Sequence, residues 1–315
     1  MERRNQSLVS EFILLGFCVT QMINVLLFAL FFISFLVTLL ANGLIIMVIL
    51  AESRLHSPMY FFICNLSLLD LCYSTTNIPT CLKGFLSRKN TITYHECVAQ
   101  MFMGLSFGVT QCFLLAVMAW DRYVAICNPL NYPRLMNKSI CMKLATASWI
   151  SGFTLSLVQV SFTMTVPFCG RIKINHVVCE LVALLRLACM DIHFIEAAIA
   201  GICVIVLVAP VSLIVFTYHH IISTILRLPA SERHKAFSTC SSHLTVVTMF
   251  YGTLIVMYMR PRSMISIEKE KVASVFYGVL TPALNPLIYS LRNKEVKGAL
   301  TNLLRRSRAG QRMQG

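Results

Sequence analysis

The chain alternates long apolar runs with short charged segments. Seven runs contain no Asp, Glu, Lys or Arg apart from Asp70 in the second, and they lie between Glu11 and Glu52, Arg54 and Lys83, Glu96 and Asp121, Lys143 and Arg171, Glu196 and Arg227, Lys235 and Arg260, and Lys271 and Arg292. The shortest, residues 272–291, is still long enough, because about 20 residues of helix cross the hydrocarbon core of a bilayer. Backbone polar groups in lipid must be satisfied within their own segment, so each run is predicted to be a membrane-spanning helix.

Composition supports this interpretation. The chain has 315 residues, of which 57% are hydrophobic and 13% are charged, whereas a soluble domain carries about 25% charged residues. We therefore expect an all-α membrane protein with an N-terminal tail at residues 1–21, a seven-transmembrane helix bundle at residues 22–291, and a cytoplasmic amphipathic helix and tail at residues 292–315.

The last segment has the pattern of a short eighth helix that lies on the membrane. Its apolar residues share one helical face and basic residues surround them; the apolar set is Leu291, Val296, Leu300, Leu303 and Leu304, and the basic set is Lys294, Lys297, Arg305 and Arg306. A basic amphipathic helix of this kind binds the anionic inner leaflet.

The net charge of +14 at first suggests a nucleic-acid partner, but its distribution argues against one. With the N-terminus outside, the cytoplasmic segments carry more Lys and Arg than the external segments, as the positive-inside rule requires. We expect a multi-pass plasma-membrane protein, with an extracellular N-terminus, a cytoplasmic C-terminus and the lipid bilayer as partner. Asn5 begins an Asn-Gln-Ser sequon in the predicted external tail, so it is a predicted glycosylation site.

The third apolar run ends in Asp121, Arg122 and Tyr123. A charge near the hydrocarbon costs at least about 2.5–3.5 kcal/mol on insertion scales, so such residues usually have a purpose. A lone arginine at this place would ordinarily extend to the lipid headgroups. Here the arginine is part of a charged triplet at the inner end of a spanning helix.

Two further polar positions lie inside predicted spans. Asp70 is in the middle of the second run, and an intramembrane carboxylate indicates a functional site. In the seventh run, Asn285 precedes Pro286. The proline leaves backbone carbonyls without partners, and Asn285 could help to satisfy them, which predicts a deformable point in this helix.

The segment before the sixth run contains Ser, Cys and His together, which raises the question of catalysis. Cys240 and His243 would lie at a cytoplasmic helix end with no carboxylate to orient the histidine. A nucleophile site needs such an orienting group, so we predict that the protein is not an enzyme. We assign no catalytic residue and no metal site of the His/Cys type.

Four cysteines belong to the predicted external side: Cys97 at the start of the third run, and Cys169, Cys179 and Cys189 in the following external loop. Cysteines on an oxidising side form disulfides, and four of them allow three pairings. Their spacing does not choose among these pairings. Most other cysteines lie inside or at the inner ends of helices, where we expect them to act as small apolar packing residues.

Several motifs, in the same order and spacing, closely resemble those of the odorant receptors, a family of class A (rhodopsin-like) G-protein-coupled receptors, and specifically their tetrapod-type class II. The motifs are Leu55-His56-Ser57-Pro58-Met59-Tyr60, Met118-Ala119-Trp120-Asp121-Arg122-Tyr123, Lys235-Ala236-Phe237-Ser238-Thr239-Cys240, and Pro282-Ala283-Leu284-Asn285-Pro286. Family members usually have Tyr where this chain has Trp120, and His where it has Asn128. The resemblance extends from about Leu55 to Leu300.

The resemblance implies an odorant receptor that binds small volatile hydrophobic molecules in a transmembrane pocket. Its partner would be the heterotrimeric G protein of the olfactory stimulatory type, and activation would raise cyclic AMP. By family position, the pocket lies in the outer half of helices three, five and six and is lined by Gly104, Leu105, Gly108, Val109, Ile202, Cys203, Val206, Leu207, Tyr251, Leu254, Ile255 and Tyr258. The resemblance also favours a Cys97–Cys179 disulfide, which leaves Cys169 to pair with Cys189.

The same resemblance assigns residues to activation and G-protein coupling, namely Asp121, Arg122, Tyr123, Tyr218, His243, Asn285, Pro286 and Tyr289. It further implies that Arg122 pairs with Asp121 at rest, although adjacent helix residues do not face one another. Asp70 corresponds to the family's sodium position. Many odorant receptors have a second carboxylate where this chain has Gln111, so we expect either weak sodium binding or a partly protonated Asp70. No other cofactor is expected.

The main alternative is a non-olfactory class A G-protein-coupled receptor for another small ligand. The short tail at residues 1–21 argues against a ligand-capturing domain, and the helix-six motif argues against other receptor families. A retinal protein would need a lysine in the last span, and residues 272–291 contain none. A transporter or channel would show internal repeats or several intramembrane charges, and this chain has only Asp70.

Overall fold

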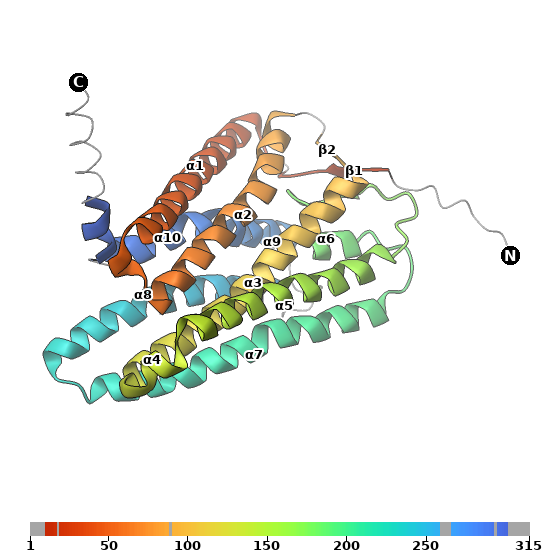
Figure 1. Cartoon of the computed structure of the whole chain (residues 1–315). Helices are drawn as coiled ribbons and strands as arrows, with labels where there is room; N and C mark the ends of the chain where they lie inside the picture. The colour runs from red at the N-terminus through yellow and green to blue at the C-terminus, as the bar shows by residue number, and fades with distance from the viewer. Residues whose placement is uncertain (1–9, 18, 88–89, 259–265, 293–294, 302–315) are drawn as a thin grey trace, which may run out of the picture.

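The computed structural model describes residues 10–17, 19–87, 90–258, 266–292 and 295–301. Long helices form a bundle (Figure 1), and six helical segments in the described residues are long and apolar enough to cross a membrane. These segments are α1 (Gln21–Ala51), α3 (Tyr94–Cys127), α5 (Lys138–Met164), α7 (His193–Leu226), α8 (Ala230–Tyr258), and the continuous segment of α9 (Ile267–Val275), η4 (Phe276–Leu280) and α10 (Thr281–Arg292).

The seventh helix of the bundle is α2 (Pro58–Leu86), which packs against α1 and α3. It contains the polar residues Asp70, Asn77 and Lys83 within its apolar sequence. Its first turn begins with Pro58, a position where the missing N–H has no helical partner in any case. The predicted seven-helix membrane bundle is therefore confirmed.

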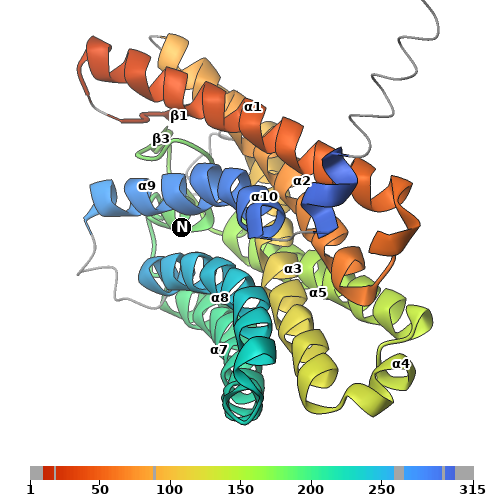
Figure 2. The same ribbon diagram turned by 90° about the vertical axis from the view of Figure 1, so that its left-hand side faces the viewer.

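The outer faces of the helices are apolar. On α1, Leu26, Ile33, Leu40 and Met47 recur every seven residues and are 59–72% exposed. An exposed apolar stripe along a whole helix suits contact with lipid chains. The helix α3 lies in the middle of the bundle (Figure 2), where it contacts α2, α5, α7 and α8.

One end of the bundle carries a small sheet, and we call it the sheet end. Strand β1 (Glu11–Leu14) pairs antiparallel with β2 (Thr91–Thr93) and parallel with β3 (Lys173–Ile174). Phe12 and Leu14 point inward from β1 and are at most 3% exposed. The tail, for which the sequence predicted no secondary structure, thus contributes the central strand of this sheet.

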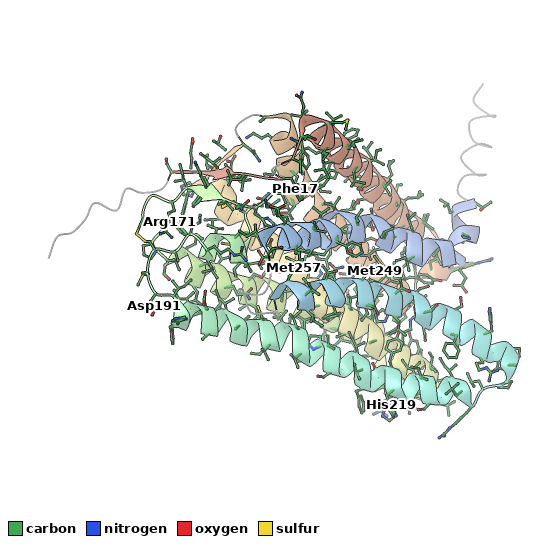
Figure 3. The ribbon with its side chains drawn as sticks, turned by 180° about the vertical axis from the view of Figure 1, so that it is seen from behind. Phe17, Arg171, Asp191, His219, Met249 and Met257 are labelled. Carbon is green, nitrogen blue, oxygen red and sulfur yellow. A yellow bond between two sulfur atoms is a disulfide. The ribbon has the colours of Figure 1, made fainter. Side chains whose placement is uncertain are left out.

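Two disulfides and the short helix α6 (Leu181–Leu185) lie towards the sheet end. Cys97 bonds to Cys179, and Cys169 bonds to Cys189, as the resemblance implied. The backbone N–H of Cys179 also donates to Gln100 Oε1 at 2.9 Å, so the loop is fixed to α3 twice. Figure 3 shows Arg171 and Asp191 at this end, whereas His219 of α7 lies towards the other.

The opposite end, which we call the α4 end, holds the turns η1 (Ser53–Leu55) and η2 (Pro129–Asn131) and the short helix α4 (Tyr132–Leu135). Residues 295–301 form a helical segment here, with Val296 and Ala299 buried and Lys297 exposed. Tyr60 donates to Glu295 Oε2 at 2.7 Å, which holds this segment against α2. Residues 293–294 and 302–315 of the predicted eighth helix and tail lie outside the described part of the chain, as does Asn5; among them are Lys294, Leu303, Leu304, Arg305 and Arg306.

Polar side chains connect the helices inside the apolar bundle. Pro286 has no N–H, so the carbonyl of Pro282, four residues earlier, receives no helical hydrogen bond. Asn42 Nδ2 of α1 donates to this carbonyl at 3.1 Å. The expectation that Asn285 satisfies the freed backbone was wrong at this carbonyl, because Asn285 donates to Asp70 instead.

The closest helix approach is at Gly152 of α5. A Cβ added there would lie against Thr110 Oγ1 of α3 and 2.8 Å from the carbonyl oxygen of Ser106. Gly43 of α1 is different, because an added Cβ there meets no atom within 4 Å. Small residues let helix backbones approach in membranes, and here that role belongs to Gly152.

We predict opposite effects for the same substitution at these two glycines. Gly152→Ala should destabilise the protein by about 1–3 kcal/mol, because the backbone of α3 must move to accept the methyl group. Gly43→Ala should be neutral or stabilising by up to about 1 kcal/mol, since alanine is the better helix former. Thermal unfolding of the detergent-solubilised protein measures both; an equal change in the two variants would contradict the packing at Gly152.

Candidate functional site

A cavity of about 50 Å³ lies inside the bundle on the sheet-end side of α3, and we call it the α3 cavity. Its lining comes from α3, α5, α6, α7, α8 and η4, and consists of Gly104, Leu105, Gly108, Val109, Cys112, Gln159, Leu181, Cys203, Val206, Leu207, Leu254 and Tyr277. Most of these side chains are apolar, and none carries a charge. The chemistry of this lining therefore suits a small, weakly polar molecule.

Two glycines create the space at the wall formed by α3. Gly104 and Gly108 are four residues apart, so they lie on the same face of the helix. A Cβ added to Gly108 would meet nothing within 4 Å, and one added to Gly104 would come no nearer than 3.8 Å, to the Asn77 amide. The wall formed by α3 therefore leaves space for the cavity, because glycine has no side chain at these two positions.

A second cavity of about 40 Å³ adjoins the first, and we call it the loop cavity. It shares Gly104, Leu105, Leu181 and Tyr277 with the α3 cavity, and it is more polar because Tyr73, Asn77, Gln100, Glu180 and Ser274 also line it. The hydroxyl of Tyr73 donates to that of Tyr277 at 2.7 Å. Tyr277 lies in the π-helical turn η4, a feature that is frequent at functional sites.

The loop after β3 closes the loop cavity through a buried polar cluster. His176 Nε2 lies 3.0 Å from Glu180 Oε2 and 3.1 Å from Ser274 Oγ, and Ser274 donates to Glu180 at 3.0 Å. Arg186 forms a second link across the same interface, to Glu270 of α9 at 2.5 Å. These contacts connect the loop to the outer part of the seventh span.

At the α4 end, Asp121 is 2% exposed, and its Oδ1 accepts a hydrogen bond from Tyr132 at 2.8 Å. Burial, together with the neighbouring Asp121, raises the pKa of Tyr132 above its ordinary value. Arg122 points elsewhere, and its Nη2 contacts Met59 Sδ of α2. Among the described residues, the structure has no ion pair between Arg122 and Asp121, so the expected local pairing is corrected; adjacent helix residues point in different directions.

A hydrogen-bonded chain links three helices beside Arg122. His243 of α8 is fully buried; its Nδ1 lies 2.9 Å from the Tyr218 hydroxyl of α7, and its Nε2 lies 3.2 Å from the carbonyl oxygen of Leu115 in α3. Both ring nitrogens of His243 are thus occupied by partners on other helices. This arrangement holds α8 close to α3, and it leaves His243 without the carboxylate that a nucleophile site would require.

These features can be compared with known proteins. The family profile described as "Olfactory receptor" matches residues 31–307. The chain belongs to the olfactory receptor family. It is 48% identical to human olfactory receptor 13C9 over 310 residues (96% of this chain and 98% of the relative). It is 49% identical to human olfactory receptor 2F1 over 301 residues (95% of each) and 45% identical to mouse olfactory receptor 6B9 over 302 residues (96% of each).

Membership confirms several predictions. This olfactory receptor belongs to a family of G-protein-coupled receptors that is not enzymatic, so the absence of a catalytic role for Cys240 and His243 is confirmed. The chain is a multi-pass membrane protein. The family as a whole binds odorants and couples to G proteins, which favours the olfactory prediction over the alternative class A receptor.

The structure brings eight of the twelve predicted pocket residues of this receptor to the α3 cavity: Gly104, Leu105, Gly108, Val109, Cys203, Val206, Leu207 and Leu254. The other four differ. Ile202 is half-buried and does not line the cavity, and Ile255 is 42% exposed on the outside of α8. Tyr251 is buried, and its hydroxyl donates to the Cys112 carbonyl at 2.6 Å. The side chain of Tyr258 lies outside the described part of the chain.

Four lining residues were missed by sequence reasoning: Cys112, Gln159, Leu181 and Tyr277. Gln159 had a signal, because it is the one amide residue in a fourth run whose other polar residues are mostly Ser and Thr. Leu181 had none, since it lies in an external loop whose path cannot be read from hydropathy. Tyr277 comes from the seventh span, which the prediction had not placed at the pocket.

Of the remaining predicted activation residues, Tyr123 lies against the rings of Trp120 and His220, and Asn285 contacts Asp70. Asp70 is 1% exposed, and both of its carboxylate oxygens accept from Asn285 Nδ2, at 3.2 and 3.0 Å. Asn285 Oδ1, Gln111 Nε2 and the Tyr289 hydroxyl are buried without a hydrogen-bond partner in the described residues. Carboxylate and amide oxygens are ligands for hard cations such as Na⁺, so Asp70 and Asn285 fit the predicted ion site.

Proposed function

We propose that this receptor binds a small volatile molecule in the α3 cavity and activates the heterotrimeric G protein of the olfactory stimulatory type, which raises cyclic AMP. In this proposal the sheet end is extracellular, the α4 end is cytoplasmic, and the protein is in the plasma membrane. The observation that supports it is an uncharged, mostly apolar cavity that adjoins the external loop and contains most of the positions where the family is expected to hold its odorant.

The size of the cavity suggests how binding is coupled to activation. At about 50 Å³ it is far below the roughly 300–1,000 Å³ of typical ligand sites. A ligand therefore requires the helices around the cavity to separate, and it binds the separated form better than the closed one. A ligand shifts a conformational equilibrium only through such a difference in affinity.

The α4 end would respond through α8. Leu254 of α8 lines the cavity, and His243 of the same helix contacts Tyr218 and α3 near Arg122. Outward movement of α8 would break the His243 contact to the Leu115 carbonyl and open the cytoplasmic side beside Arg122. Arg122, Tyr123 and the basic turns at this end would then contact the G protein.

We further propose that Asp70 holds a weakly bound sodium ion, with the Asn285 amide turned so that Oδ1 in place of Nδ2 faces Asp70 and serves as a neutral second ligand. Gln111 contributes no negative charge where many family members have a carboxylate, so the site carries a single carboxylate. A cation there would stabilise the resting arrangement in which α2 and α10 are joined by Asp70 and Asn285.

Filling the cavity tests the proposed odorant site. Val206→Trp should raise the half-maximal concentration of any agonist by at least about tenfold, because the indole occupies the binding space. Val208→Trp is the matched control, since Val208 is on the same helix but is 43% exposed on its outer side. The measurement is cyclic AMP in cells challenged with an odorant panel, at equal surface expression. An equal loss in both variants, or in neither, would refute this placement.

Removing the arginine tests the proposed coupling site. Arg122→Ala should reduce agonist-driven cyclic AMP by at least about tenfold while leaving the agonist-induced rise in melting temperature of the purified receptor unchanged, because the guanidinium is remote from the α3 cavity. Normal cyclic AMP signalling from this variant at wild-type surface expression would show that Arg122 is not required for coupling.

Sodium dependence tests the ion site. Replacing potassium by sodium should raise the melting temperature of the purified wild-type receptor, and Asp70→Asn should abolish that rise because the ligand charge is gone. A wild-type receptor that does not respond to sodium would contradict the ion and favour a protonated Asp70. A sodium response that persists in Asp70→Asn would place the ion elsewhere.

A further inference from the structure

The α3 cavity contains a polar atom that the proposed function has not used. Gln159 of α5 lines the cavity and is 3% exposed. Its Nε2 donates to the Cys203 thiol at 3.8 Å, whereas its Oε1 has no hydrogen-bond partner in the described residues. An unpaired buried acceptor is unfavourable, because the oxygen has lost its bond to water and gained none in return.

Gln159 lies on the face of α5 that is turned towards the cavity. The two preceding residues of α5, Leu157 and Val158, are 56% and 39% exposed on its outer side. Gln159 instead faces inward, between α3 and α7, where its amide is fixed by the contact with Cys203. Gln159 thus places an amide with an unpaired oxygen at the wall of an apolar space.

The rest of the lining limits what could bond to this oxygen. No Asp, Glu, Lys, Arg or His lines the α3 cavity. A carboxylate or an ammonium ligand would therefore be buried without a countercharge, which is strongly unfavourable. A hydrocarbon, an ether or a ketone would leave Gln159 Oε1 unpaired, because none of them can donate a hydrogen bond.

We propose that Gln159 is a specificity-determining residue whose Oε1 accepts a hydrogen bond from a hydroxyl-bearing odorant, so that the receptor prefers neutral alcohols and phenols. The inference rests on the proposed function in so far as it places the odorant in the α3 cavity. It goes further by adding a residue of the fourth span to the recognition site and by naming the chemical class of ligand. The apolar body of the ligand then packs against the aliphatic side chains of α3 and α7.

The test uses odorants matched in shape but different in hydrogen bonding: an alcohol, its methyl ether and the corresponding ketone on the same carbon skeleton, for several linear and cyclic skeletons. Binding is measured as the shift in melting temperature of the purified receptor, and signalling is measured separately as cyclic AMP in cells. For wild type, we expect alcohols to bind about tenfold more tightly than their ethers and ketones, the size of one buried hydrogen bond.

Gln159→Met keeps the length of the side chain and removes the acceptor oxygen. In this variant the alcohol should lose its advantage, so that alcohol and ether bind within about twofold of each other. Gln159→Leu provides a second apolar variant should the first not reach the membrane. Ser156→Ala is the matched control: Ser156 is on α5, is fully buried, and has an equally unpaired Oγ, but it does not line the cavity. This variant should keep the full preference for alcohols.

The outcomes separate the inference from the proposed function. Ketones or ethers that bind wild type as tightly as alcohols would overturn the inference while leaving an odorant site in place, and so would a preference for alcohols that persists in both Gln159 variants. A preference for ketones would overturn it by showing that the amide presents Nε2 to the ligand. Selective binding of alcohols without cyclic AMP production would support the inference and contradict the proposed G-protein pathway.

Discussion

The bilayer offers no hydrogen bonds, so every polar group inside the bundle must find its partner in the protein. This constraint organises the whole structure. The carbonyl of Pro282, which Pro286 leaves unpaired, accepts from Asn42; Asp70 accepts from Asn285; and His243 is placed between Tyr218 and the Leu115 carbonyl. Each of these contacts joins two or three spans that are distant in sequence. Apolar packing alone would not fix their mutual positions, since lipid chains are as apolar as leucine.

Four of the buried polar groups that escape this rule in the described residues lie where the receptor is expected to work. In the described residues, Asn285 Oδ1, Gln111 Nε2 and the Tyr289 hydroxyl are buried without partners in the part of the bundle proposed to rearrange, and Gln159 Oε1 is unpaired at the α3 cavity. Unpaired buried groups are rare because they are costly. Their positions here suggest that an ion, a ligand or a second conformation of the receptor supplies the missing bonds.

Much of the fold follows from the sequence, because a long charge-free segment that crosses a bilayer must satisfy its own backbone hydrogen bonds and therefore forms a helix. The faces of the helices were harder to predict. Ile255 was expected at the pocket but faces outward, and Gln159 was missed. A soluble helix reveals its inner face by an apolar stripe, whereas a spanning helix such as α7 is apolar on every side. The inward-facing residues were predicted from the family resemblance and not from periodicity. The resemblance gave such residues for the third, fifth and sixth spans, which are the spans where it places the pocket.

The contacts that were predicted wrongly share a physical cause. Arg122 and Asp121 are adjacent in sequence, and Asn285 lies beside Pro286, which frees the Pro282 carbonyl that Asn285 was expected to satisfy, so both expectations assumed a local contact. Adjacent helix residues such as Asp121 and Arg122 point apart, and Asn285 donates to Asp70 of α2 instead. Asp121 instead accepts a hydrogen bond from Tyr132 of α4, and the Pro282 carbonyl accepts one from Asn42 of α1. The strand β1 escaped prediction for a related reason, since its partners β2 and β3 lie far along the chain.

The two cavities and the hydrogen bonds at the α4 end together explain how one bundle can be both closed and responsive. Gly104 and Gly108 leave a space at α3 that is too small for a ligand, while Gly152 brings α5 directly against the same helix. The α3–α5 contact is therefore the rigid side of the bundle. The α7–α8 side is joined to α3 by hydrogen bonds that can break and re-form, among them those of His243, of Tyr251 to the Cys112 carbonyl and between Cys127 and Thr224. A ligand that enlarges the cavity in the proposed way would exchange these hydrogen bonds on the α7–α8 side, whereas the contact at Gly152 leaves no room to adjust on the α5 side.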